Sequence, residues 1–361
     1  MTPTVKVYPA DLGGCGYYRI TWPARALQAQ GHESVDVVMP DEPEERQIQA
    51  QWLRRDGGHD ELLGVAPMDA DVVVLQRPLT DTLAQAVPML QRQGIKVVVE
   101  IDDDFEAISR RNVSWSHVQP HLHPRRNKAW LAAACAQADL VVCSTLALAE
   151  RYGSHGRVRV VRNRVPAAYL DIERPTIDAP ASIGWSGSTE THPDDLQVTG
   201  GGVARAVRAT GATFAVVGTG RGVRQRLGLA EHPVACGWQP IEHYPIAMAQ
   251  FDVGIVPLEL TAFNAAKSSL KMMEMAALGV VPVVSPTPEN LRLWGEAVGI
   301  VADSPRRWEG ILKRLVRDDD YRTELAERSR GVMRRHTIEG NADEWLAAWT
   351  APLSAGKVRT A

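Results

Sequence analysis

Cysteine is scarce in this chain, and neither sign of charge dominates its composition. The 361 residues include four cysteines, and none of them forms a CxxC pair. The sequence therefore excludes a disulfide framework and favours a reducing compartment. A formal net charge of -3 predicts no general attraction to polyanions, and the scattered arginine pairs are typical of solvated helix surface.

Long apolar runs are missing as well. No stretch approaches the ~20 apolar residues that a membrane-spanning helix requires, and no basic segment followed by a long apolar one stands at the N-terminus. We therefore expect a cytoplasmic protein with neither an export signal nor a transmembrane segment. Peripheral contact with a membrane stays open.

The chain is too long for one ordinary α/β core, which favours two domains. Short β-branched runs alternate with helical stretches in two series, as in βαβ units with parallel sheets. A proline-containing stretch interrupts this periodicity once. We predict an α/β fold with four parts: an N-terminal Rossmann-like domain in residues 1–165, a linker in 166–180, a second Rossmann-like domain in 181–335, and a C-terminal helix and tail in 336–361.

The β-branched runs predict the strands, and apolar residues at helical spacing predict the helices. Strands are expected at Val5–Tyr8, Val35–Met39, Asp71–Leu75, Lys96–Ile101, Leu140–Ser144 and Val158–Val161 in the first domain, and at Ser182–Trp185, Thr213–Val217, Val234–Gly237, Val253–Pro257 and Val280–Ser285 in the second. The clearest helices are Tyr17–Gln30, Lys128–Ala138 and two within Asp319–Thr350, where Trp345 and Trp349 share one face.

The first predicted strand ends in a glycine-rich turn, DLGGCGYYR (residues 11–19), that opens directly into a helix. Glycines let a backbone approach a ligand, and a helix start offers free N–H groups to an anion. Arg19 stands where a NAD fingerprint has its third glycine, which disfavours dinucleotide binding, although Asp36 keeps that alternative open. A tight turn without a ligand is the other alternative. A second turn, VGTGRG (residues 217–222), follows a strand of the second domain in the same way.

The most specific segment is the stretch from Asn264 to Leu278. Asn264 is expected to cap a helix whose first turn holds Lys267, Ser268 and Ser269, where the helix dipole favours phosphate. Lys267, Lys271 and Glu274 share one helix face. Lysine supplies the charge that a leaving diphosphate needs, and a carboxylate suits the hydroxyls of a ribose. An ordinary surface helix with a Lys271–Glu274 ion pair is the alternative.

Acidic and histidine-rich loops follow in the first domain. Asp102, Asp103 and Asp104 come after a strand; Asp103 and Asp104 are candidates for the base that takes the proton of an acceptor hydroxyl, or for an acceptor clamp. A solvated acid cluster at a strand end is the alternative. The Asp-x-Asp spacing is also a metal-binding signature of an enzyme fold with a single domain, which the two-domain organisation disfavours. We also expect His117, His121, His123 and Trp115 to contact an acceptor or sugar rather than a metal.

Several of these segments resemble GT-B glycosyltransferases, particularly the glycosyltransferase 4-like group. FNAAKSSLKMMEMAALGVVPVVS (263–285) resembles the donor-binding helix and following strand of that group. ADLVVCSTLALAERY (138–152) with VRVVRNRVP (158–166), and GGCGYYRITWPARALQAQGH (13–32), resemble the closing and opening segments of its N-terminal domain. VVVEIDDDFEAI (97–108) and IGWSGSTETHPDDL (183–196) are similar to segments of less typical members. The resemblance implies two Rossmann-like domains with a cleft between them and C-terminal helices that cross back to the first.

By position, the resemblance implies Lys267 near the donor phosphates, Glu274 on the ribose, Gly218 and Gly220 near the nucleotide, and Gly14 and Gly16 beside the diphosphate or the acceptor. The remaining candidates are Lys271, Asn264, Ser268, Arg221, Ser186 and His192 on the donor side, and Tyr17 and Arg19 in the first loop. The chain departs from the group in two places. Ala266 replaces the first of two glutamates, and hydroxyl residues with His192 replace a basic pair.

The resemblance therefore implies a hexosyl- or pentosyltransferase of class EC 2.4. Such an enzyme moves a sugar from a nucleotide diphosphate-sugar to an acceptor hydroxyl, with Lys267 neutralising the departing diphosphate and no obligatory cofactor or metal. The acceptor stays open among a glycan, a protein, a metabolite and a modified DNA base. A nucleotide-sugar epimerase, an NAD-dependent oxidoreductase and a non-catalytic nucleotide-binding module are the alternatives.

Overall fold

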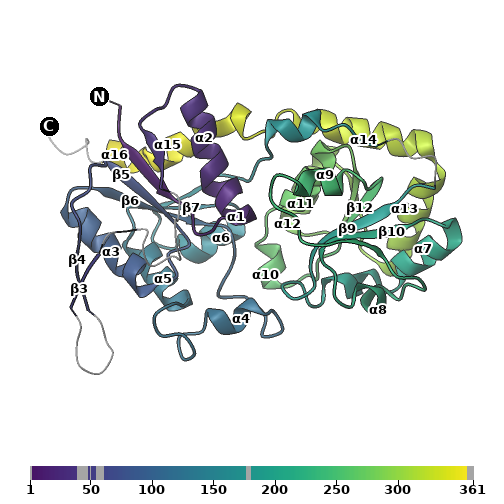
Figure 1. The fold of residues 1–361 in the computed structure, drawn as a ribbon, viewed down its shortest axis with the longest axis horizontal. Helices are drawn as coiled ribbons and strands as arrows, with labels where there is room; N and C mark the ends of the chain where they lie inside the picture. Colours follow the sequence, from purple (N-terminus) through teal and green to yellow (C-terminus); the bar gives the residue numbers. More distant parts are fainter. Residues whose placement is uncertain (1, 39–47, 49, 54–60, 176–179, 356–361) are drawn as a thin grey trace. The chain divides into compact units, whose positions relative to one another are not determined.

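A computed structural model describes residues 2–38, 48, 50–53, 61–175 and 180–355 (Figure 1). The chain divides into two compact units. Unit 1 comprises residues 1–108, 114–163 and 341–361, and unit 2 comprises residues 109–113 and 164–340. The expected linker, residues 166–180, belongs to unit 2 and includes the 3₁₀ helix η3 (Ala167–Asp171). The part of that linker at 176–179 and the pair Arg54-Arg55 lie outside the described residues.

The sheet of unit 1 is parallel and six-stranded. Its strands lie in the order β2-β1-β5-β6-β7-β8. Their bounds are β1 (Val5–Tyr8), β2 (Val35–Val37), β5 (Val72–Gln76), β6 (Lys96–Ile101), β7 (Leu140–Cys143) and β8 (Val158–Val160). All six were predicted, β1 and β6 with the observed ends and the others with ends that differ by one or two residues; Met39 lies outside the described residues. An antiparallel hairpin of β3 (Ala50–Leu53) and β4 (Glu61–Val65) was not predicted.

The helices of unit 1 belong to the N-terminal half of the chain, except for two that lie near its C-terminal end. They are α1 (Gly14–Gly16), the π-helical turn η1 (Tyr17–Thr21), α2 (Trp22–Ala29), α3 (Asp81–Arg92), α4 (Ser114–His117), α5 (Lys128–Gln137), α6 (Leu146–Tyr152), α15 (Ala342–Trp349) and α16 (Ala351–Ala355). The purple α2 and the yellow α15 pack against each other in Figure 1. The C-terminal helices thus return to the unit in which the chain begins, as expected.

Unit 2 repeats this architecture. Its parallel sheet has the order β11-β10-β9-β12-β13-β14. The strands are β9 (Ile183–Ser188), β10 (Phe214–Thr219), β11 (Val234–Cys236), β12 (Val253–Val256), β13 (Val281–Val284) and β14 (Ile300–Val301). Five of them were predicted. The two-residue β14 was missed because so short a run carries no periodicity.

The helices of unit 2 are α7 (Gly202–Thr210), α8 (Val223–Leu227), α9 (Tyr244–Met248), α10 (Ala262–Ala265), α11 (Leu270–Ala277), α12 (Pro288–Gly295), α13 (Pro305–Arg317) and α14 (Asp319–Met333), with the short 3₁₀ turn η4 (Asp195–Thr199). A further 3₁₀ turn, η5 (Glu339–Asn341), crosses the boundary between the two units. The interruption expected near Thr337–Gly340 is confirmed, since α14 ends at Met333 and α15 begins at Ala342.

The cores explain the strand sequences. All residues of β5, β7, β12 and β13 are buried, as in parallel sheets that helices cover on both faces. Trp345 and Trp349 are fully buried, so the predicted shared face of their helix is a core face. Within the described residues, no helix is both long enough and apolar enough to cross a membrane.

Candidate functional site

Each sheet contains one pair of neighbouring strands from which the chain proceeds in opposite directions. In unit 1 this switch point lies between β1 and β5, and in unit 2 it lies between β9 and β12. Open parallel sheets bind ligands at the carboxyl ends of the strands beside such a point. We therefore describe the site from the residues that follow these four strands.

At the switch point of unit 1, the carboxylate of Asp11 occupies the glycine-rich turn. Its Oδ1 accepts hydrogen bonds from the N–H groups of Gly13 (2.8 Å) and Gly16 (3.1 Å), and its Oδ2 pairs with Arg77, which follows β5. The sequence predicted that N–H groups of this turn would bind an external anion. In the structure, two of them bind the carboxylate of Asp11 instead. A Cβ at Gly16 would lie 1.9 Å from the carbonyl oxygen of Asp11, so the close backbone approach requires glycine.

The other residues of this predicted loop separate into two groups. Gly14 has open space where a side chain would stand, and Tyr17 is half-buried. Arg19, in contrast, is buried: it forms a 2.6 Å ion pair with Glu100, and its Nη1 donates to Val161 O and Asn163 Oδ1. The assignment of Arg19 to a diphosphate or acceptor loop is thus corrected, because buried partners hold its guanidinium in the core of unit 1.

Arg77 connects Asp11 to the acidic residues after β6. It has a positive φ of 46°, and its Nε lies 3.6 Å from Asp102 Oδ1. Burial by itself lowers the pKa of Arg77, but Asp102 and Asp11 raise it above its ordinary range, so it remains a cation. Burial raises the pKa of Asp102, and the pKa of Cys15 is raised first by burial and then by Asp102. Ligand atoms of Cys15, Asp102 and Asp103 lie within 4.8 Å of one another.

The two proposed bases of this cluster lie in different surroundings. Asp103 is half-buried at the strand end. Asp104 is buried: its Oδ1 accepts from Glu106 N–H (3.1 Å) and its Oδ2 from Arg151 Nε (3.2 Å). The structure therefore gives Asp104 a local structural role, since its oxygens cap the turn after β6, and this corrects its assignment as a base. Asp103 remains a candidate.

The histidine loop lies further along unit 1. His117, His121 and His123 are exposed, and the rings of His117 and His123 lie 6.0 Å apart. The Trp115 and His121 rings lie 6.4 Å apart. Acceptor contact by this loop remains a prediction.

Next to the switch point of unit 2, two paired glycines bring the loops after β9 and β10 together. Gly187 and Gly218 are partners in the strand register, and a Cβ on Gly218 would lie 2.3 Å from Gly187 O. Gly218 also has a φ of +111°, which favours glycine. A Cβ on Gly220 would contact Val216 at 2.8 Å. Arg221 is exposed, and its carbonyl oxygen accepts a 2.8 Å bond from Thr189.

A histidine–aspartate pair links β9 to β12. His192 Nδ1 lies 2.6 Å from Asp195 Oδ2. Asp195 Oδ1 accepts from the N–H of Glu259 (2.9 Å), after β12, and from Asn264 Nδ2 (2.8 Å). The same carboxylate thus fixes the imidazole and joins the two loops that border the switch point.

A second polar array lies where α11 meets α9 and β9. Lys271 Nζ and the Tyr244 hydroxyl both donate to Glu274 Oε2, at 3.3 and 3.4 Å, and Lys271 also donates to the Tyr244 hydroxyl. Tyr244 Oη lies 2.8 Å from Ser186 Oγ. Burial and then the Glu274 carboxylate raise the pKa of Tyr244 to about 12, so its hydroxyl keeps its proton. Burial alone lowers the pKa of Lys271, but Glu274 raises it above its ordinary range, which keeps the ammonium charged.

The start of this helix differs from the prediction. Thr261, not Asn264, caps a short helix, α10, by accepting a bond from Asn264 N–H. The Asn264 amide is buried against Asp195 and Glu259, so it cannot cap. Helix α11 begins only at Leu270, and Lys267 and Ser268 lie in the turn before it. The ammonium of Lys267 lies 4.5 Å from the centre of the Phe263 ring.

Four residues of these sites were not predicted: Asp11, Arg77, Asp195 and Tyr244. The positions of Asp11 and Arg77 just after strands β1 and β5 could have suggested them. Tyr244 lies thirty residues before Glu274, and no spacing in the sequence connects it to α11.

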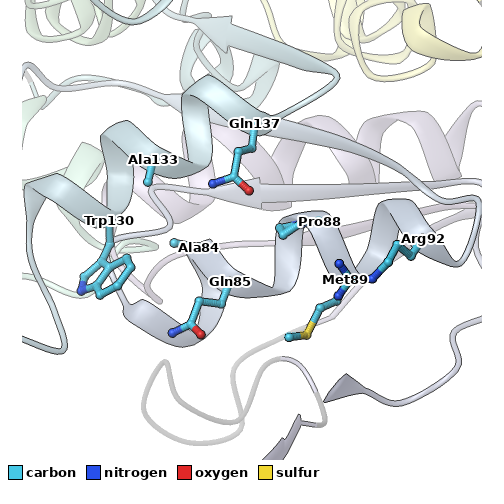
Figure 2. Close-up of a pocket in the computed structure, with 8 residues that line it drawn as sticks. All are labelled: Ala84, Gln85, Pro88, Met89, Arg92, Trp130, Ala133 and Gln137. Carbon is cyan, nitrogen blue, oxygen red and sulfur yellow. The ribbon is translucent and has the colours of Figure 1, made fainter. Parts of the chain in front are cut away.

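A groove of about 280 Å³ lies elsewhere on unit 1, between α3 and α5 (Figure 2). Its lining includes Pro88 and Met89 from α3 and Trp130 from α5, with Ala84, Gln85, Arg92, Ala133 and Gln137. None of the strand-end residues described above lines it, so it is separate from the switch point.

Comparison with known proteins agrees with this architecture. Residues 203–347 match a family model described as "Glycosyl transferase-like". HepE from Anabaena, in complex with UDP, has a TM-score of 0.60 and 13% identity over 97% of this chain and 99% of that chain. Sucrose-phosphate synthase from Thermosynechococcus elongatus has a TM-score of 0.65 and 14% identity over 97% of this chain and 99% of that chain. The starch synthase IV catalytic domain from Arabidopsis thaliana, bound to ADP and acarbose, has a TM-score of 0.61 and 12% identity over 98% of this chain and 100% of that chain. No curated protein matches the chain.

At these identities, the structural likeness shows a fold. Two Rossmann-like units, each built on a six-stranded parallel sheet, define that fold as GT-B. The family match falls on the second unit and its following helices. The chain therefore has the GT-B fold, and its residues 203–347 are similar to a glycosyl transferase-like family.

Proposed function

We propose that unit 2 binds a nucleotide diphosphate-sugar at its switch point and that the enzyme transfers the sugar to an acceptor hydroxyl without an obligatory metal ion. The observation that carries this proposal is the array of Lys271, Tyr244, Glu274 and Ser186 at the carboxyl ends of the strands. A buried carboxylate next to a charged lysine offers an acceptor for ribose hydroxyls and a cation for phosphate in one place.

The chemistry requires stabilisation of a leaving group. When the bond between the sugar and the diphosphate breaks, the electron pair goes to a phosphate oxygen and negative charge develops there. Lys271 and, in the turn before α11, Lys267 supply positive charge on the donor side. We propose that these ammonium groups perform the neutralisation for which other transferases use a divalent cation.

The acceptor is proposed to bind at the switch point of unit 1. There, Asp11, Asp102 and Asp103 lie around the guanidinium of Arg77. Such a cluster suits hydroxyl groups, which donate hydrogen bonds to carboxylates, better than it suits a polyanion. This supports a glycan or small polyhydroxyl acceptor over a modified DNA base, and Asp103 as the group that receives the hydroxyl proton.

The location proposed for the enzyme is the cytoplasm. All four cysteines are free thiols in the structure, which fits a reducing compartment.

A thermal-shift screen tests the proposed function. The full chain is heated with UDP-, GDP-, ADP- and dTDP-sugars, with and without EDTA, and one sugar nucleotide is expected to raise the melting temperature in both series. Glu274→Gln should lose this shift, whereas Glu309→Gln, on α13, should keep it. Stabilisation by NADH alone would favour an oxidoreductase instead.

Product analysis then separates the remaining alternatives. Donor incubated with the enzyme alone should release free sugar slowly, as a transferase does when water replaces the acceptor. An epimerised donor would identify an epimerase, and no turnover at all would leave a nucleotide-binding module. A shift that disappears with EDTA would contradict metal independence.

A further inference from the structure

The His192–Asp195 pair is built more rigidly than an ordinary surface ion pair. The Asp195 side chain is only 6% exposed, and both of its oxygens are used. Oδ1 accepts from Asn264 Nδ2 at 2.8 Å and from Glu259 N–H at 2.9 Å, and Oδ2 lies 2.6 Å from His192 Nδ1. A carboxylate held by two donors cannot rotate away, so the imidazole has a fixed partner and a fixed orientation.

This arrangement determines the chemistry of the other ring nitrogen. Because Asp195 can only accept, Nδ1 must carry a proton and donate it. Nε2 is then a lone-pair acceptor in the neutral ring and an N–H donor in the charged ring. The His192 side chain is 26% exposed, and no partner for Nε2 occurs in the part of the chain that the structure describes.

The pair lies beside the switch point of unit 2, where open parallel sheets bind ligands. His192 follows β9, and its backbone N–H donates to Ser188 O at 3.0 Å. Asp195 connects it to the loop after β12, because Asp195 also accepts from the Glu259 N–H. It therefore lies at the switch point, where the loops after both strands meet. Ser186, a member of the array with Tyr244 and Glu274, lies on the same strand.

Charged neighbours of His192 on adjacent elements have partners of their own. Asp194 forms a 2.5 Å ion pair with Arg111, and Arg226 donates to the carbonyl oxygen of Pro193. Glu190 and Glu259 are exposed. Asp195 is consequently the charged group that contacts the imidazole directly.

We propose that protonated His192 donates Nε2–H to the diphosphate of the donor, with Asp195 as the positioning residue, so that donor affinity falls as the imidazole loses its proton. This inference rests on the proposed function. It involves binding only, and no bond is formed or broken by the pair.

The test uses calorimetric titration of the full chain between pH 5.5 and 8.5. The ligands are the nucleoside diphosphate selected by the thermal-shift screen and inorganic pyrophosphate, which carries no base. Wild-type affinity should fall with rising pH. His192→Phe should bind roughly tenfold more weakly at the acid end and should keep only the slope that the ligand's own ionisation produces.

Asp195→Asn provides the diagnostic variant. Its amide oxygen must face the two donors at Oδ1, so its NH₂ faces Nδ1 and the neutral ring carries its proton on Nε2. This variant should bind better than His192→Phe at high pH and show a flattened slope. His232→Phe, an exposed histidine that contacts Arg224, is the matched control and should behave as the wild type.

Each outcome decides the question. If wild type binds neither ligand, both the proposed function and this inference fail. If wild type binds but His192→Phe has the same affinity and slope, or Asp195→Asn keeps the wild-type slope, only the inference is overturned. Should His192→Phe not fold, His192→Gln, which donates without carrying charge, must show only the slope of the ligand's own ionisation for the inference to stand.

Discussion

Tyr244 shows how much of a polar site can depend on one hydroxyl. Lys271, Glu274 and Ser186 all contact it, and its proton is retained because its pKa lies at about 12. We expect Tyr244→Phe to lower kcat/KM about tenfold, because Glu274 and Lys271 lose a shared partner, and to lower the free energy of unfolding by about 1 kcal/mol. Steady-state kinetics and urea denaturation measure the two effects.

The control for this variant is Tyr321→Phe. Tyr321 lies on α14 in the same unit and stacks its ring on Arg314. Kinetics unchanged in both variants would show that the Tyr244 hydroxyl has no part in the reaction.

Asp252, directly before β12, allows a prediction of pH dependence at the amino ends of the strands in unit 2. Burial by itself raises its pKa, but the Ser182 N–H at 2.8 Å and the Arg174 guanidinium lower the pKa below its ordinary range. A lowered pKa in the folded state contributes stability above the unfolded value of ~3.9, and this stability is lost as pH falls through the folded value. Asp252→Asn should therefore cost about 1 kcal/mol at pH 7 and progressively less below about pH 4.

Denaturation curves at several pH values check this sign. Asp319→Asn, whose side chain is 78% exposed beside Arg322, serves as control and should be nearly neutral throughout. A difference between wild type and Asp252→Asn that grows toward acid would contradict the assignment.

Residue types together with the family resemblance led to Glu274, Lys271, Ser186 and His192 as donor-side candidates, but their partners could not be predicted. Asp195 lies 64 residues from Glu259 and 69 from Asn264. Such contacts are formed by strand order, which local periodicity does not encode. For the same reason, Arg19 was expected at a ligand and lies in the core, where Glu100 needs its charge.

At the level of elements, the paired glycines of β9 and β10 set how close two loops can come. Gly218→Ala would place a methyl group 2.3 Å from Gly187 O in a backbone conformation with positive φ. We expect a loss of about 2 to 4 kcal/mol in the free energy of unfolding, together with weaker donor binding, because the loops must separate. Chemical denaturation and the thermal-shift assay measure these effects.

Gly211→Ala is the matched control for this substitution. Its φ of +72° carries similar strain, but no atom lies within 4 Å of the added Cβ. It should cost only about 1 kcal/mol. Equal losses in the two variants would mean that the steric contact with Gly187 has no effect.

Element types and the strand series were predictable because buried parallel strands are continuous β-branched runs. The residues at which helices begin were harder to predict. The expected helix from Asn264 divides at residues 266–269, because the Thr261 side chain caps the first part and tertiary contacts hold the Asn264 amide. Capping residues of similar chemistry, three positions apart, cannot be ranked without those contacts.

For the whole molecule, the return of the C-terminal helices to unit 1 has an energetic role. The Trp349 indole is fully buried and donates a 3.0 Å hydrogen bond to Glu100 Oε1, and burial raises the pKa of Glu100 even with Arg19 beside it. Trp349→Leu should lower stability by about 3 kcal/mol, since it leaves a cavity and removes a partner from a buried carboxylate.

Hydrogen exchange locates this effect. Amides of β6 and β7 in unit 1 should lose protection, while those of β12 and β13 in unit 2 should not. Trp238→Leu, at a tryptophan that is 75% exposed in unit 2, is the control and should leave both sheets protected. Loss of protection confined to unit 2 would contradict the prediction.

The order of the chain has a consequence for biosynthesis. Most of unit 2 is contiguous, whereas unit 1 is completed only by residues 341–361. During translation, unit 2 can therefore close before α15 and α16 complete unit 1, although the strands of unit 1 are synthesised before those of unit 2. A chain that ends before α15 would contain a complete unit 2 joined to an incomplete unit 1, and its exposed apolar surface would be recognised by chaperones and proteases.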